Sequence, residues 1–594
     1  MNAQEKLIQL RSVLWERHAD GFLLPVADEF LGEYVPASAA RLEWLTGFTG
    51  SAGLAVVLAE SAALFTDGRY TLQAKQEVSA AHYAQFNSAD CKPEQWVVEH
   101  LDEGMALGFD PWLHSQREVE KLEQALAPKH IRLVPLIPNP VDALWEDRPA
   151  APESVVEIHP EEYAGEAHQH KQKKVVEALR KAGAHMALLA ASDSVDWLLN
   201  IRGRDVPYSP LLLAYGLIEE SGRTALYVDP QRVSADVRAH LVPGVEVRDP
   251  ALLPGDLAEI GGRKWRVLAD PALTPSWFVS TLRSAGAEVV LADDPCQRLK
   301  AIKNKVEMKG MQRAHERDGL ALTRFLCWLD KETPHRDMTE REAVARLLEF
   351  RRQAPEFVSP SFETIAGSGP NGAIVHYRVT QGSNRVLHQN DLFLLDSGGQ
   401  YPDGTTDVTR TVAIGEPAKE HREHFTRVLK GHIALALAHF PEGTSGSQLD
   451  ALARHPLWCA GLDYDHGTGH GVGCFLNVHE GPQRIGKRGG DAALEAGMIV
   501  SNEPGYYREG RYGIRIENLV QVVRVGEMAN GKAMLGFETI TCVPMDLRLV
   551  DAALLDADEK KWLNTYHERV FDRHEDKLDS AERAWLENAT RNIA

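Results

Sequence analysis

The sequence predicts an α+β protein in which helices and strands are mixed throughout several domains. Its 594 residues are too many for one hydrophobic core, so we expect roughly two to four domains. Helix-periodic stretches at residues 2–18, 168–182 and 303–331 alternate with short apolar runs. Two of these runs, residues 53–58 and 62–65, are typical of buried strands. The hydrophobic fraction of 44% and the charged fraction of 25% are those of an ordinary folded protein.

Changes in composition mark two domain boundaries. Residues 138–160 are rich in Pro, Asp and Glu, and the run Asp293-Asp-Pro-Cys296 marks a second boundary. A helical pattern followed by a strand-like run restarts at residues 168–190, which indicates a second α/β domain with a layout similar to that of the first. We therefore divide the chain into three domains at residues 1–160, 161–301 and 302–594.

Both ends of the chain are predicted to be helical. The first helix, residues 2–18, is expected to be amphipathic. Its buried side is predicted to carry Leu7, Leu10, Leu14 and Trp15. The last segment, residues 551–594, is rich in Lys, Glu, Asp and Trp. We expect it to form helices that pack on the outside of the last domain and take no part in its chemistry.

Charge and cysteine usage limit the partners and the compartment. The net charge is −20, from 85 acidic and 65 basic residues, which argues against general binding to nucleic acid or anionic membranes. The six cysteines are scattered without a C-x-x-C pair, and we expect them to be buried thiols in a reducing compartment. Neither a signal-peptide pattern nor an apolar run of about 18 residues is present. We therefore expect a cytoplasmic protein with no nucleic-acid or membrane partner.

The first chemical signal is a pair of aspartates around a predicted turn. An apolar strand runs into Asp396, the turn at residues 402–404 follows, and a second strand starts at Asp407. Two strands joined in this way can bring Asp396 and Asp407 side by side. Adjacent carboxylates repel each other, so they are tolerated mainly where a cation lies between them. The alternative is that one aspartate caps the turn and the other is solvated.

The second signal is a glycine-rich run that contains histidines. His466 and His470 lie in H-G-T-G-H-G-V-G, and His479 follows shortly after. The glycine spacing matches neither a dinucleotide-binding loop nor a phosphate-binding P-loop. Glycines beside histidines let the backbone and the imidazoles approach one point closely. A single histidine is usually a core or surface residue, but three within so short a segment favour a site.

Two glutamates complete the set. An apolar strand ends at Glu503, and in residues 512–518 two isoleucines alternate with Arg515 and Glu517, so a strand would point both charged side chains to one face. Either glutamate alone would be read as a surface residue. Together, two Asp, two Glu and one His form an oxygen-rich cage that suits Mn²⁺, Co²⁺ or Fe²⁺ better than a soft thiolate site would.

These motifs together resemble a known family. The runs D-S-G-G-Q-Y-P-D-G-T-T-D-V-T-R-T, H-G-T-G-H-G-V-G, V-H-E-G-P, E-P-G-Y-Y and G-I-R-I-E-N are similar to those of the pita-bread metallopeptidases, and within them to the three-domain X-prolyl aminopeptidases. Residues 47–53, 66–70, 195–205 and 300–307 extend the resemblance outside the catalytic part. The resemblance implies a C-terminal pita-bread (creatinase/aminopeptidase-like) catalytic domain preceded by two α/β creatinase-N-like domains.

The resemblance also assigns roles to single residues. It implies that Asp396 is a terminal metal ligand and that Asp407 and Glu517 bridge two metals. His470 and Glu503 are then the remaining ligands, with Glu503 also moving protons. Further residues expected to contact the peptide, or to stabilise its transition state, are His376, His466, His479 and Arg515. Every ligand position follows the family pattern.

The implied activity is release of the first residue from peptides that have proline in the second position. A hydroxide shared by two divalent ions would attack the first carbonyl, and Glu503 would deliver a proton to the proline nitrogen. We expect Mn²⁺ first, with Co²⁺, Fe²⁺ or Zn²⁺ as alternatives, and a homodimer.

Three other functions are possible on the sequence alone. A prolidase, which cuts Xaa-Pro dipeptides, is the main alternative, but prolidases resemble a two-domain layout. A methionine aminopeptidase would not need roughly 300 further residues in front of the catalytic part. A non-catalytic pita-bread binding module would have lost the ligands that this chain keeps.

Overall fold

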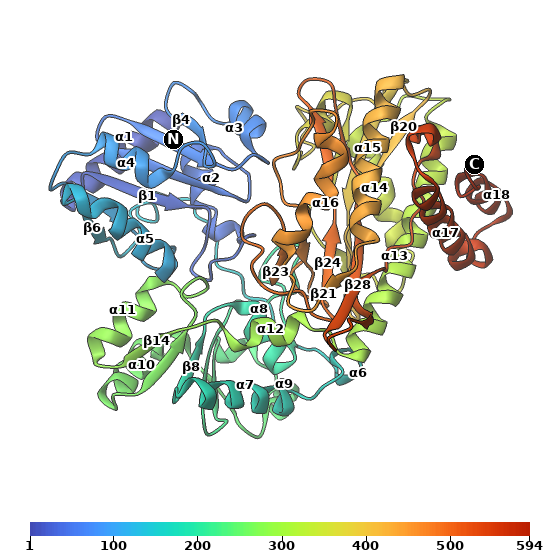
Figure 1. Ribbon diagram of the computed structural model, residues 1–594. Helices are drawn as coiled ribbons and strands as arrows, with labels where there is room; N and C mark the ends of the chain where they lie inside the picture. The colour runs from blue at the N-terminus through green and yellow to red at the C-terminus, as the bar shows by residue number, and fades with distance from the viewer. The chain divides into compact units, whose positions relative to one another are not determined.

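The computed structural model describes residues 1–594 and divides into two compact units (Figure 1). The first unit comprises residues 1–161 and 166–297, and the second comprises residues 162–165 and 298–594. The change from one unit to the other follows the predicted boundary at residues 293–296. The exact limits of three domains stay a prediction.

The first unit contains two six-stranded sheets. The strands of the first sheet are β1 (Gly21–Pro25), β2 (Gly53–Leu58), β3 (Ala62–Thr66), β4 (Ala84–Asn87), β5 (Ala106–Phe109) and β6 (Arg132–Pro135). Those of the second are β8 (Met186–Leu189), β10 (Tyr215–Glu219), β11 (Thr224–Tyr227), β12 (Val245–Arg248), β13 (Arg266–Ala269) and β14 (Glu288–Leu291). A short pair, β7 (Glu157–Ile158) and β9 (Ile201–Arg202), lies apart from both sheets.

The two sheets have the same topology. The first has the order β4-β3-β2-β1-β5-β6 and the second the order β12-β11-β10-β8-β13-β14. In each sheet the first three strands of the sequence pair antiparallel, and the other neighbours pair parallel. The restart of the pattern after the first boundary therefore reflects a repeated α/β layout.

Helices cover these sheets. They are α1 (Ala3–Glu16), α2 (Arg41–Thr46), α3 (Thr71–Glu77), α4 (Pro93–His100), α5 (Gln116–Leu126), α7 (His168–Ala182), α8 (Ser192–Leu199), α9 (Ala235–Leu241), α10 (Leu253–Gly262) and α11 (Ser276–Ala285). Helix α7 has the bounds that the sequence predicts. Two further helices, α6 (Glu161–Ala164) and α12 (Pro295–Ala301), contain the residues at which the chain passes from one unit to the other.

Helix α1 corrects one prediction. Asn2 caps it in a capping box with Glu5, and its three leucines are buried as expected. Trp15, in contrast, is 81% exposed. A helix turns about 100° per residue, so Trp15 points away from the buried Leu14 and shares the outer face with the exposed Ile8, two turns earlier.

The second unit is built on two larger sheets and two small ones. A three-stranded sheet consists of β16 (Ile365–Ser368), β17 (Asp391–Ser397) and β20 (Val408–Ile414). A six-stranded sheet consists, in spatial order, of β21 (Phe440–Pro441), β28 (Ala533–Thr539), β27 (Asn518–Glu527), β24 (Ile499–Asn502), β22 (Gly469–Gly471) and β23 (Glu480–Ile485). The small sheets are β25 (Gly505–Arg508) with β26 (Tyr512–Arg515), and β15 (Ser359–Pro360) with β18 (Gly399–Tyr401) and β19 (Gly404–Thr405).

Six helices surround these sheets. They are α13 (Lys305–Glu332), α14 (Glu340–Arg351), α15 (Lys419–Ala436), α16 (Gly446–Trp458), α17 (Ala557–His574) and α18 (Ser580–Ala589). Helix α13 begins at a capping box formed by Asn304 and Glu307. The C-terminal helices α17 and α18 lie against α13 on the outside of the unit (Figure 1). Leu563 and Val570 of α17 nevertheless belong to the same core cluster as Ile514 and Ile516.

The cysteines are all free thiols, but they are not all buried. Cys459 is exposed and Cys91 is partly exposed, which corrects the expectation for these two residues. No helix combines the length and apolar character needed to cross a membrane.

Candidate metal centre

Two antiparallel strands bring the predicted aspartates together. Strand β17 pairs with β20 so that Asp396 lies opposite Thr409, and Asp407 comes directly before β20. All residues of β20, and all but the first of β17, are buried, so both faces of this strand pair are covered by the rest of the unit. Asp396 and Asp407 therefore meet at one end of the pair, as the sequence predicts.

The other three ligand candidates come from neighbouring strands of the six-stranded sheet. His470 lies on β22, Glu503 directly follows β24, and Glu517 directly precedes β27. Strand β24 lies between β22 and β27, and its last pair with β27 joins Asn502 to Asn518. This pairing brings the two glutamates to the same end of the sheet, next to the histidine.

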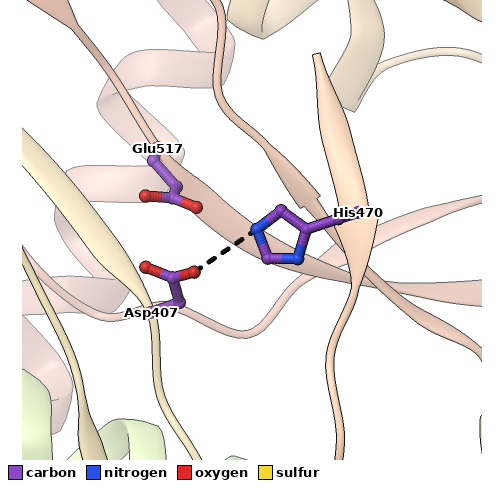
Figure 2. A group of neighbouring side chains, drawn as sticks. All are labelled: Asp407, His470 and Glu517. Carbon is purple, nitrogen blue, oxygen red and sulfur yellow. Dashed lines mark ion pairs between the residues drawn. The ribbon is translucent and has the colours of Figure 1, made fainter. Parts of the chain in front are cut away.

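Asp407, His470 and Glu517 form a compact group (Figure 2). One ligand atom from each lies within 4.8 Å of the others. Nε2 of His470 is 3.5 Å from Oδ2 of Asp407 and 3.5 Å from Oε1 of Glu503. Nδ1 of His470 lies 2.9 Å from the carbonyl oxygen of Gly471. A carbonyl can only accept, so Nδ1 carries a proton, and it is Nε2 that faces the carboxylates and would offer its lone pair to a bound metal ion.

The crowded negative charge perturbs the titration of the site. Burial, together with the charges of Asp396 and Glu503, raises the pKa of Asp407 to about 6. Burial and the neighbouring carboxylates raise the pKa of Glu517 well above its usual value. For His470, burial lowers the pKa, but the bond to Asp407 and the charge of Glu503 outweigh it and raise the pKa to about 9. The protein groups alone therefore do not neutralise the negative charge of the carboxylates, whereas a bound cation would neutralise it.

The donor atoms fit divalent metal ions. Oδ1 of Asp396 is buried and accepts no hydrogen bond from the protein, although buried carboxylate oxygens normally have partners. Four carboxylates and one imidazole are the ligands that harder divalent ions prefer. The five residues predicted as ligands are thus close together, and one of them has an oxygen available.

Arg515 is held by protein groups. Its Nη2 donates to Oδ2 of Asp396 at 2.6 Å, and its Nη1 donates to the hydroxyl of Tyr507 at 2.6 Å. Its Nε donates to Oγ1 of Thr409 at 3.1 Å, and that hydroxyl donates to Oε2 of Glu517 at 2.8 Å. The predicted contact of Arg515 with substrate stays a prediction, because these bonds all lead to protein groups.

Three residues near the ligands were missed by the sequence argument. Thr409 lies within the first motif, and Tyr507 is the last residue of E-P-G-Y-Y, so the motifs themselves could have pointed to both. Ser501 donates from Oγ to Oε1 of Glu503 at 3.1 Å and accepts from the backbone N–H of His470 at 2.9 Å. A serine two residues before a glutamate on a buried strand carries no chemical signal of its own.

The predicted substrate-side histidines lie at the edges of the group. Nε2 of His466 is 2.9 Å from the hydroxyl of Tyr507, and the ring of His479 packs edge-on against that of His470 with centroids 4.3 Å apart. His376 is partly exposed, and the carbonyl of the preceding residue, Val375, accepts from Nη1 of Arg515 at 3.3 Å. His479 therefore lies directly against a ligand candidate, His466 is joined to the group through Tyr507, and the backbone before His376 is joined to it through Arg515.

Family models match the chain from end to end. The model of metallopeptidase family M24 matches residues 309–524, and that of the C-terminal region of this peptidase family matches residues 533–593. Two models of the creatinase/prolidase N-terminal domain match residues 6–142 and 147–307. Aminopeptidase P2 of Arabidopsis thaliana is 41% identical to this chain, over 99% of the chain and 88% of its own length. The chain belongs to metallopeptidase family M24.

Other M24 relatives agree with this assignment. A probable Xaa-Pro aminopeptidase P of Talaromyces marneffei is 38% identical over 100% of the chain and 93% of its own length. The crystal structure of X-prolyl aminopeptidase from Caenorhabditis elegans, described as a cytosolic enzyme with a di-nuclear active site, covers 100% of both chains at 36% identity, with a TM-score of 0.95. The pita-bread catalytic part behind two creatinase-type domains is thereby confirmed.

Proposed function

We propose that this M24 peptidase releases the N-terminal residue from peptides with proline in the second position. The observation that carries the proposal is the group of Asp407, His470 and Glu517, in a chain whose relatives over its whole length are named aminopeptidases P or X-prolyl aminopeptidases. The prolidase alternative is weaker. Xaa-Pro dipeptidase from Bacillus anthracis covers only 64% of this chain, at 26% identity and a TM-score of 0.52.

The metal centre would hold two divalent ions. The residues that would hold them are Asp396, Asp407, His470, Glu503 and Glu517. Two ions in such a site supply Lewis acidity, which lowers the pKa of a bound water and polarises the carbonyl under attack. Mn²⁺ is the proposed native ion, because four carboxylates and one imidazole suit it better than they suit a thiolate-seeking metal.

The chain's own groups would move the protons and hold the peptide. Glu503 takes the proton of the attacking water and passes it to the proline nitrogen, which is a poor leaving group until it is protonated. Ser501 orients the Glu503 carboxylate through its bond to Oε1. His376, His466 and His479 would contact the peptide, and the bond between His466 and Tyr507 keeps that imidazole in place.

The first test is peptide hydrolysis by metal-stripped protein, with and without added Mn²⁺. Arg-Pro-Pro is the substrate, Arg-Ala-Pro controls for the second position, and Ala-Pro tests the prolidase alternative. We expect Mn²⁺-dependent release of arginine from Arg-Pro-Pro, with little action on the other two peptides. Cleavage of Ala-Pro alone would establish a prolidase instead. An intact protein that binds Mn²⁺ and cleaves none of the three would contradict the proposal.

We also propose a cytoplasmic homodimer. The M24 relative from Caenorhabditis elegans is described as cytosolic. In the second unit, helix α16 exposes two large apolar side chains, Leu452 and Trp458, 40% and 46% accessible, and such side chains suit burial between subunits. Light scattering should give about twice 65.8 kDa. Trp458→Glu should reduce that mass, and a wild-type protein that is monomeric at micromolar concentration would refute the dimer.

A further inference from the structure

A buried hydrogen-bond network lies directly behind the ligand glutamates. We call it the back network, and it consists of Arg410, His432, Asn502, Asn518 and Tyr566. All five side chains are buried. They come from β20, α15, the end of β24, the start of β27 and α17. The network therefore joins elements that are far apart in the sequence.

The two asparagines connect the back network to the ligands. Asn502 and Asn518 are paired across β24 and β27, and each is the chain neighbour of a ligand glutamate, Glu503 and Glu517 respectively. Any shift of this pair would move both carboxylates, because a peptide unit is rigid and each glutamate lies one residue away. The pair therefore links the backbone positions of the two ligand candidates.

His432 ties the two asparagines together. Its Nδ1 lies 3.1 Å from the backbone oxygen of Asn502, so Nδ1 donates and the neutral Nε2 must accept. Nε2 accepts from Nδ2 of Asn518 at 3.1 Å, and Nδ2 of Asn502 donates back to the carbonyl of His432 at 2.9 Å. The tautomer of the ring and the orientation of the Asn518 amide are thus fixed by each other.

Arg410 clamps the other side of the pair. Its Nη1 donates to the carbonyl oxygens of Glu517, at 2.6 Å, and Thr409, at 2.8 Å. Its Nη2 donates to Oδ1 of Asn518 at 2.8 Å. A buried guanidinium that loses its acceptors is costly, so these carbonyls have little freedom to move. Arg410 thus restrains both Glu517 and Thr409, whose hydroxyl binds the Glu517 carboxylate.

The C-terminal helix α17 completes the back network. The Tyr566 hydroxyl accepts from Nη2 of Arg410 at 2.8 Å and donates to the carbonyl of Val543 at 2.7 Å. The Tyr566 ring stacks on Trp562, with centroids 5.4 Å apart and planes at 3°. The Trp562 ring packs against His432 in turn, at 5.7 Å. One outer helix therefore contacts both ends of the network.

We propose that the back network is a positioning device for Glu503 and Glu517, and that helix α17 is part of it. His432 would act through the two asparagines and Tyr566 through Arg410, and neither would touch metal or substrate. Groups behind a metal site tune its affinity because they set where the ligand atoms point. This role rests on the proposed function of the two glutamates as ligands. It also replaces the expectation that residues 551–594 take no part in the chemistry.

The test compares Tyr566→Phe with Tyr215→Phe. Both remove a buried hydroxyl that donates to a backbone carbonyl, since Tyr215 donates to Glu29 at 2.8 Å in the first unit, outside the site. Mn²⁺ affinity of the metal-free protein is measured by calorimetry, and kcat and KM by Arg-Pro-Pro hydrolysis. For Tyr566→Phe we expect roughly tenfold weaker binding of at least one Mn²⁺ and a lower kcat with KM within about twofold. Tyr215→Phe should change neither value.

His432 gives a graded second series. His432→Leu removes both ring contacts, whereas His432→Gln can keep one, so the loss of Mn²⁺ affinity should be larger for leucine than for glutamine. The contrary result is that the Tyr566 and His432 variants match Tyr215→Phe in Mn²⁺ affinity and kcat and differ only in a lower melting temperature. If the wild-type protein still behaves as proposed, that result would overturn the positioning role and leave the proposed function standing. A wild-type protein that binds no Mn²⁺ would overturn the proposed function and this inference together.

Discussion

Arg515 donates a 2.6 Å hydrogen bond from Nη2 to Oδ2 of Asp396, while Oδ1 of the same carboxylate accepts none from the protein. The guanidinium thus fixes one oxygen of the aspartate and leaves the other for a metal. Nε of Arg515 also donates to the Thr409 hydroxyl, which in turn donates to Glu517. The guanidinium of Arg515 therefore orients two ligand candidates, Asp396 and Glu517, that are more than a hundred residues apart.

Arg515→Met should therefore weaken metal binding as well as catalysis. We expect a loss of about 10- to 100-fold in Mn²⁺ affinity or in kcat/KM, because both ligands lose an orienting group and Asp396 loses its countercharge. Calorimetry and peptide hydrolysis measure the two effects. Arg41→Met is the matched control, since Arg41 is a buried arginine that pairs with Glu29 and Asp142 in the first unit. Equal effects of the two substitutions on Mn²⁺ affinity would contradict the orienting role.

Glu503→Gln tests the proton carrier. At saturating Mn²⁺ we expect kcat to fall by about 10²- to 10⁴-fold, the range for loss of a general acid–base group, because glutamine cannot accept the proton of the attacking water. Glu509→Gln, at an exposed position a few residues later, should leave kcat unchanged. Wild-type kcat in Glu503→Gln would exclude this residue as the proton carrier.

Removal of metal should lower the stability of the second unit. A ligand that binds only the folded state at 100 times its Kd stabilises it by about 2.7 kcal/mol, so chelation should lower, and Mn²⁺ restore, the unfolding temperature of that unit. Differential scanning calorimetry in chelator, and then with Mn²⁺ added, measures this. His470→Ala removes the nitrogen ligand and should reduce the Mn²⁺ response. A response of full size in this variant would place the stabilising ion elsewhere.

Asp28 in the first unit gives a pH-dependent prediction. Burial raises its pKa to about 6, although the backbone N–H groups of Phe30 and Gly32 donate to it. The folded state therefore holds a proton that the unfolded chain releases near pH 4, so the contribution of Asp28 to stability is fully present below that pH and is lost as pH rises through about 6. Asp28→Asn keeps the Oδ1 acceptor and removes the buried charge.

We expect Asp28→Asn to stabilise the first unit at pH 7.5 by up to about 2 kcal/mol, and by almost nothing at pH 4. Urea unfolding at several pH values measures the difference. The exposed Asp90→Asn is the control and should show no such trend. A stability difference for Asp28→Asn that is the same at both pH values would show that the buried charge is not its cause.

Local sequence patterns predicted many of the helices and strands. The bounds of α7 follow from its helical periodicity, and the strands that lead to Asp396 and Glu503 follow from their apolar runs, since burial of apolar side chains stabilises both kinds of element. Trp15 shows the limit of such patterns. Placing an apolar residue next to a buried leucine does not bury it, because the helical turn points it elsewhere, and only the packing of α1 decides which face is covered.

The sequence by itself determined the five ligand candidates, the acid-rich chemistry of the centre and the family resemblance, because these depend on residue types at fixed spacings. Only the tertiary structure decided that Arg515 binds Asp396, that His432 joins Asn502 to Asn518, and that Tyr566 of an outer helix reaches Arg410. The physical reason is that these bonds join segments far apart in the chain. Their geometry is set by how sheets and helices pack, and no local pattern encodes that packing.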